Sequence, residues 1–197
     1  LGIDIQFSRG IDVASRSQGD VGEGTPLSRG SGKNNFSHFK LDTTYAVALD
    51  KNLEFNINTG GQLSLDDLLN SEQSGITGPD KLSGFTSGSI SGDESWYFRG
   101  QVNYKKKLSN KLTLTPYVYG ATGVSYTLTP TATENRATAA KSIGLGLKMD
   151  GIDNYFFDKN ISAKVEYSKN WATGVLEDVS DVRLNKQHLL VNLAMNF

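Results

Sequence analysis

The chain has 197 residues, with 20 lysines and arginines against 21 acidic residues, no cysteine and two histidines. A net charge of −1 gives no electrostatic reason to expect a nucleic-acid partner. The absence of cysteine excludes disulfides, thiolate metal sites and cysteine nucleophiles. No run approaches the roughly 18 apolar residues of a membrane helix, so composition alone suggests a soluble protein. A transmembrane β-barrel has the same average polarity, because its strands alternate lipid-facing and lumen-facing residues.

Alternating apolar and polar residues recur along the chain and predict eight β-strands. In chain order the alternating runs are residues 1–13, 39–49, 53–65, 96–105, 112–124, 142–149, 161–168 and 188–197. Most have roughly ten residues or more, which is the length that a tilted strand needs to cross a bilayer. Strands of soluble proteins are typically nearer five or six residues.

The links between these runs alternate in length. Short links fall at 50–52, 108–111 and 150–159, and long polar links fall at 14–37, 66–95, 126–139 and 172–183. Outer-membrane barrels have short periplasmic turns and long extracellular loops. We therefore expect an all-β fold, an antiparallel transmembrane β-barrel region over residues 1–197. The loop 66–95 is then extracellular, and the parity of the strands places the C-terminus in the periplasm.

A soluble antiparallel sandwich or barrel would alternate equally well. Two features favour the membrane barrel: charges stand in mid-strand, as in a wet lumen, and aromatic residues gather near strand ends, as in an interfacial girdle. The side chains that we expect to face the lumen, where they would line a path or hold the loop, are Glu54, Arg99, Gln101, Tyr117, Tyr119, Lys164 and Glu166.

The long loop carries a series of motifs in a fixed order. Thr77-Gly78-Pro79-Asp80-Lys81-Leu82-Ser83-Gly84-Phe85 is followed by Ser91-Gly92-Asp93 and then by Trp96. This series resembles the Gly-Gly-Pro-x-x-Val-Arg-Gly-Phe/Tyr loop motif and the Ser-Gly-Asp of the outer-membrane transporters of two-partner secretion, the TpsB type. Ser8-Arg9-Gly10, Gly61-Gln62 and Leu68-Leu69-x-Ser71-Glu72-Gln73 resemble further stretches of that family. The resemblance covers essentially the whole chain and corresponds to the C-terminal half of such a transporter. The loop residues that it marks are Gly78, Pro79, Leu82, Ser83, Gly84, Phe85, Ser91, Gly92 and Asp93.

Two positions depart from the family pattern. The loop motif has arginine where this chain has Ser83, and a lumen-facing strand has aspartate where this chain has Ala121. In the family the resemblance implies an ion pair between these two positions, and both of its partners are missing here. Losing only one partner would leave a desolvated charge at considerable cost, so losing both is physically coherent. We expect a loop that is held less tightly, or by other contacts such as Asp80, Lys81 or Asp93.

The resemblance implies transport of a protein across the outer membrane of a Gram-negative bacterium. The implied partners are an unfolded exoprotein of the haemolysin, adhesin or contact-dependent toxin type, the lipid bilayer, and the barrel assembly machinery. That machinery would read the aromatic Phe197 at the end of the last strand. No catalytic residue, metal or cofactor is expected: His188 is interpreted as a lumen residue, and the acidic pairs in the links offer too few oxygens for Ca²⁺. The alternative is a small eight-stranded outer-membrane barrel with a structural or adhesive role and no transport.

Eight strands are too few for a wide channel, since a barrel of that size is nearly filled by its own side chains and an aqueous channel takes about sixteen. The chain begins Leu1-Gly2-Ile3-Asp4, without an initiator methionine or a basic leader. We therefore expect it to be the second half of a sixteen-stranded barrel. Two copies that together form one barrel are the other arrangement considered.

Overall fold

A computed structural model describes residues 1–11, 29, 31–109, 112–131, 134–153, 160–176 and 179–195. The regular structure of these residues is β-strand throughout. None of them forms a helix with the length and apolarity of a membrane span.

Eight long strands form one antiparallel sheet in the order β1-β2-β3-β6-β8-β9-β10-β11. Their bounds are β1 (Gly2–Arg9), β2 (Ser37–Ala48), β3 (Leu53–Ser64), β6 (Glu94–Tyr104), β8 (Thr113–Tyr126), β9 (Ala137–Asp153), β10 (Asn160–Leu176) and β11 (Val179–Met195). The short β7 (Lys106–Lys107) pairs with β8, and β4 (Ser74–Gly75) pairs with β5 (Ser91–Gly92) in a separate two-stranded sheet within the long loop.

Each alternating run of the sequence corresponds to one long strand, which confirms the all-β antiparallel fold. The prediction of a long link at 172–183 is wrong, because β10 continues to Leu176 and β11 begins at Val179. Ala172 pairs with Leu184 and Gly174 with Val182, so the ladder continues beyond the last clear apolar alternation. Phe197 lies outside the described residues, as do positions 12, 13 and 196 of the predicted runs.

The two faces of the sheet differ in chemistry. Along β8, Tyr117 and Tyr119 are buried on one face, and Val118, between them, is 57% exposed on the other. The outward face carries the large exposed apolar side chains of every long strand, among them Ile5, Leu41, Leu63, Trp96, Val118, Ile143, Leu145, Tyr167, Val191 and Leu193. An apolar surface that runs over a whole sheet is far larger than a soluble monomer exposes, and it marks a surface that an apolar environment covers.

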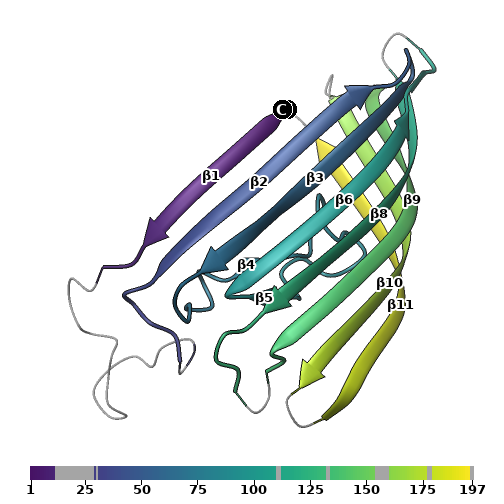
Figure 1. Cartoon of the computed structure of the whole chain (residues 1–197). Helices are drawn as coiled ribbons and strands as arrows, with labels where there is room; N and C mark the ends of the chain where they lie inside the picture. Colours follow the sequence, from purple (N-terminus) through teal and green to yellow (C-terminus); the bar gives the residue numbers. More distant parts are fainter. Residues whose placement is uncertain are drawn as a thin grey trace.

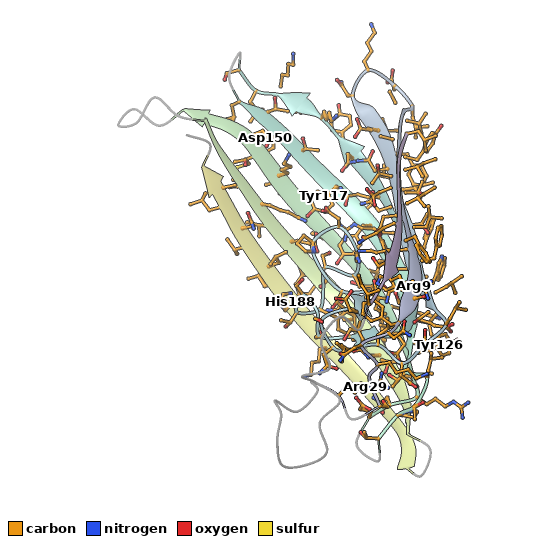
Figure 2. The ribbon with its side chains drawn as sticks, turned by 90° about the vertical axis from the view of Figure 1, so that its left-hand side faces the viewer. Arg9, Arg29, Tyr117, Tyr126, Asp150 and His188 are labelled. Atoms are coloured by element: carbon orange, nitrogen blue, oxygen red, sulfur yellow. The ribbon has the colours of Figure 1, made fainter. Side chains whose placement is uncertain are left out.

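The sheet is strongly curved and open. Figure 1 shows β1 and β11 at its two ends, with β4 and β5 in the hollow that it encloses. Within the described residues, β1 pairs only with β2, and β11 pairs only with β10. Figure 2 shows Asp150 towards the rim with the short turns and Arg29 at the opposite rim, where the longer links gather. We call these the turn rim and the loop rim.

Candidate functional site

The long link between β3 and β6 folds back into the hollow of the sheet. Its side chains Ile76 and Leu82 are fully buried and pack with the small residues Ala121, Ala140 and Ala172 of the sheet. Because these sheet residues are small, the loop packs directly against the inner face of the sheet, which we call the wall.

The turn at the end of this loop depends on local backbone geometry. Gly78 has a φ of 143°, a backbone conformation that residues other than glycine rarely adopt. The turn is closed by hydrogen bonds from the Lys81 amide to the Gly78 carbonyl (3.1 Å) and from the Leu82 amide to the Ile76 carbonyl (3.3 Å). The segment 81–84, which we call the loop tip, follows directly from this turn.

Two buried charges of the wall meet the loop tip at Ser83. Arg99 of β6 and Glu166 of β10 are 2% and 1% exposed, and their side chains approach to 3.4 Å. The Ser83 hydroxyl accepts a hydrogen bond from Arg99 Nη1 at 2.6 Å and donates one to Glu166 Oε1. Arg99 also donates to the Lys81 carbonyl at 3.2 Å. One hydroxyl therefore connects the cation and the anion.

The wall holds this pair from both sides. Tyr117 donates its hydroxyl to Glu166 Oε2 at 2.7 Å, and Lys164 Nζ lies 3.2 Å from the same oxygen. The Arg99 guanidinium lies 3.7 Å from the ring centre of Tyr119, which is within cation–π distance. Gln101 Oε1 accepts from Arg99 Nη2 at 2.7 Å. The buried carboxylate and guanidinium thus both have the hydrogen-bonding partners that buried charged groups require.

Gly84 brings the loop backbone against β10. Asn170 donates from Nδ2 to the Gly84 carbonyl at 2.8 Å, and its Oδ1 accepts from the Ser142 hydroxyl at 2.6 Å. A Cβ atom at position 84 would stand 1.8 Å from Asn170 Oδ1. Glycine is therefore needed here for close approach.

The Lys81 side chain contacts both its own loop and the neighbouring strand β6. Its ammonium donates to the Gly75 carbonyl at 2.7 Å and lies 4.7 Å from the ring centre of Tyr97. Burial lowers the pKa of Lys81, and the nearby Asp42 carboxylate opposes that shift. Its neighbour Asp80 contributes its carbonyl, which accepts from Asn58 Nδ2 at 3.2 Å.

A second buried ion pair connects the links at the loop rim. Asp93 is fully buried, and Arg29 Nη1 lies 2.8 Å from both of its carboxylate oxygens. The same carboxylate accepts from the Leu68 amide at 3.0 Å, the Leu128 amide at 2.8 Å and Gln73 Nε2 at 3.2 Å. Asp93 thus connects the β1–β2, β3–β6 and β8–β9 links. We call this arrangement the Asp93 clasp.

The other site residues that the sequence analysis selected lie in different parts of the structure. Glu54 lies near the turn rim and pairs with Lys105 at 2.7 Å, away from the loop tip. Phe85 packs against the buried cluster, Pro79 and Ser91 are exposed, and Gly92 is buried against β8. Ala121 lies in the apolar cluster under Ile76 and Leu82.

The loop tip is docked although the arginine and aspartate of the family motif are both absent. Of the two expected arrangements, a loop held less tightly or one held by other contacts, the structure has contacts of the second kind, which include those of Lys81, Asp80 and Asp93.

Sequence reasoning missed Arg29 and Asn170. Arg29 lies in a long polar link where no periodicity distinguishes one residue from another, so no sequence signal marks it. Asn170 continues the inward alternation of Lys164, Glu166 and Ser168, and extending that run by one repeat would have found it.

An antiparallel sheet with an apolar outer face, a polar inner face and a loop folded into its hollow is typical of the class of outer-membrane β-barrel proteins. Comparison with protein families gives the particular one. The family model of the haemolysin secretion/activation proteins ShlB/FhaC/HecB matches residues 1–149. The chain belongs to this family of outer-membrane secretion transporters of two-partner systems, which is not a family of enzymes. No curated protein and no solved structure matches the chain.

Proposed function

We propose that this chain forms part of the wall of an outer-membrane pore through which an unfolded exoprotein of the haemolysin, adhesin or contact-dependent toxin type is secreted. The observation that carries the proposal is the loop docked in the hollow, with its tip on the Arg99–Glu166 pair. A polar inner wall offers an extended polypeptide backbone hydrogen bonds along its way. The loop that occupies the hollow controls access to it.

The polar inner wall includes a row of amides on neighbouring strands. Asn56 and Asn58 of β3 pair in register with Gln101 and Arg99 of β6, and Asn103 lies two residues beyond Gln101. Gln101 donates to Asn103 Oδ1 at 2.6 Å, so the amides are already ordered. Each amide group has both donors and an acceptor. Such a row can hydrogen-bond the backbone of a passing polypeptide whatever its sequence.

Orientation follows from the two rims. We infer that the loop rim, with the Asp93 clasp, is extracellular and that the turn rim is periplasmic. The last strand, β11, then runs towards the periplasm, and the C-terminus lies there. Insertion by the barrel assembly machinery fits a chain of this class.

The outward apolar face is proposed to contact lipid. Replacing Leu145, which is 59% exposed in the middle of β9, by arginine is expected to cost about 2–4 kcal/mol of stability in lipid. Arginine in place of Leu49, beside the turn rim, is the control and should cost about 0–1 kcal/mol. Urea unfolding in lipid vesicles, followed by tryptophan fluorescence, measures both. Equal costs at the two positions would contradict a lipid-facing sheet.

The open sheet supports an arc of a larger barrel. Among the described residues, β1 and β11 pair on one side only, and inside a bilayer unpaired backbone groups cost several kcal/mol each. We infer that further strands complete the wall beside β1 and β11. In the alternative, a closed eight-stranded barrel, β1 and β11 would pair with each other.

Loss of secretion tests the function. In the bacterium that carries the gene, its deletion is expected to remove a large protein from the culture medium, and complementation is expected to restore it. Mass spectrometry of the medium and of the cell surface gives the readout. An unchanged set of secreted proteins together with lost surface adhesion would favour the structural or adhesive alternative.

A further inference from the structure

Two cavities lie in the hollow close to the loop tip, and both have polar and apolar linings. A cavity of about 250 Å³ lies towards the turn rim and is lined by Asp80, Arg99, Tyr117 and Lys164, among others. A cavity of about 530 Å³ lies towards the loop rim and is lined by residues that include Gly84, Asn170 and His188. Gly84 of the loop tip, 81–84, lines the larger cavity, and Asp80, directly before the tip, lines the smaller one. Movement of the tip would join the cavities into one path.

The charges that hold the tip both belong to the wall. Arg99 comes from β6 and Glu166 from β10, and Ser83 is neutral. If the tip leaves, Arg99 and Glu166 still have each other, and Lys164, Tyr117 and Gln101 remain beside them. At this pair the tip contributes only neutral groups, the Ser83 hydroxyl and the Lys81 carbonyl, and the Gly84 carbonyl accepts from Asn170. The one charge of the tip, the Lys81 ammonium, lies at the Tyr97 ring and takes no part in the Arg99–Glu166 pair.

This difference changes the cost of releasing the loop. Where a loop carries one charge of a buried pair, its release separates the pair and leaves an uncompensated charge in the wall, which is strongly unfavourable. Where both charges stay in the wall, release exchanges protein hydrogen bonds for bonds to water, and each exchange costs little.

We propose that the Arg99–Glu166 pair is a fixed wall brace and that the loop closes on it through a neutral latch made by the Ser83 hydroxyl. The inference rests on the proposed function, because it describes how access to the secretion path is controlled. Arg99 and Glu166 are positioning residues, and Ser83 is the member that makes and breaks contact. The loop opens and closes without breaking an ion pair.

A cysteine reporter tests the latch directly. The chain has no cysteine, so Thr77→Cys gives one thiol at a loop position that is 5% exposed when the loop is docked. Its labelling by a membrane-impermeant maleimide, on purified protein in lipid vesicles without any exoprotein, reports release of the loop. Adding Ser83→Ala is expected to raise the labelling rate about tenfold, the effect of losing hydrogen bonds to charged groups. Ser87→Ala, at an exposed loop position, is the matched control and should leave the rate unchanged.

The second measurement asks whether the brace survives release. Arg99→Gln and Glu166→Gln, each alone and together, give the coupling between the two side chains in thermal unfolding of the barrel. We expect the same coupling whether position 83 holds the native serine or carries the Ser83→Ala substitution. We also expect Ser83→Ala alone to lower the unfolding midpoint by no more than the tenfold loss of docking accounts for. Unaltered labelling in Ser83→Ala would overturn the latch. Coupling that disappears in the Ser83→Ala background would overturn the brace. Secretion enters neither readout, so the proposed function can fail separately.

Discussion

Replacing Gly84 by alanine is expected to displace the loop tip from β10 and to open the hollow. The added Cβ would stand 1.8 Å from Asn170 Oδ1, so Asn170 or the loop must move. Asn170 is 1% exposed, and its amide bonds to the Gly84 carbonyl and the Ser142 hydroxyl would break. Two lost bonds in a buried site correspond to about 3 kcal/mol, or roughly a hundredfold change in the ratio of docked to released loop.

Single-channel conductance in planar bilayers, with maleimide labelling of Thr77→Cys beside it, measures this effect. Gly84→Ala should give frequent open events and fast labelling. Gly75→Ala is the control within the same loop, since a Cβ there would meet its nearest atom at an ordinary 3.5 Å. Combining Gly84→Ala with Asn170→Ala removes the nearest obstacle, leaves the Ser168 hydroxyl at 2.5 Å, and should restore part of the docking. If Gly84→Ala and Gly75→Ala behaved alike, the contact with Asn170 would not hold the loop.

The strands could be predicted from the sequence because a sheet with one apolar and one polar face imposes a period of two on each strand. The runs at 39–49 and 53–65 lie within one residue or two of β2 and β3. The prediction is poorer for β9, β10 and β11, whose ends extend beyond the apolar alternation. Near the loop rim, Ala140 and Ala172 face inward beneath the loop, so small residues replace the polar ones that would have continued the signal.

The site could be predicted only in part. The motif located the loop, and mid-strand charge identified Arg99 and Glu166 as inward-facing. Which cation meets which anion depends on the curvature of the sheet, because β6 and β10 are separated by β8 and β9 in the sheet order. Pairing between neighbouring strands can be inferred from register, but contact across a hollow cannot. From the sequence, Ser83 indicated only that the arginine of the family motif is missing. Its role as a bridge between Arg99 and Glu166 depends on where those two side chains lie in the structure.

Removing the carboxylate of Asp93 is expected to have the largest effect at the loop rim. Asp93→Ala would leave Arg29, which is 4% exposed, with only the more distant Glu134 carboxylate at 3.6 Å, and breaking a buried ion pair costs about 3–5 kcal/mol. The amides of Leu68 and Leu128 would lose their acceptors at the same time. Three links would then lose the carboxylate that they share, and only weaker contacts such as those of Arg29 with the Leu68 and Thr129 carbonyls would still join them. The loop would lose most of its support at the rim, while Ser83 in its tip still met Arg99 and Glu166.

Hydrogen exchange of the Leu68 and Leu128 amides, measured by mass spectrometry on the protein in lipid vesicles, tests the clasp. Both amides should exchange at least a hundredfold faster in Asp93→Ala, because about 3 kcal/mol corresponds to that factor. Lys33→Ala is the control at the same rim. It breaks a pair with Asp66 in which Lys33 is 52% exposed, and such a pair contributes about 0–1 kcal/mol. Protection that survives Asp93→Ala would mean that the loop rim is ordered by the packing of Leu68 and its neighbours. Loss of protection confined to these two amides, with the Thr77→Cys label unchanged, would show that the clasp and the latch hold the two ends of the loop independently.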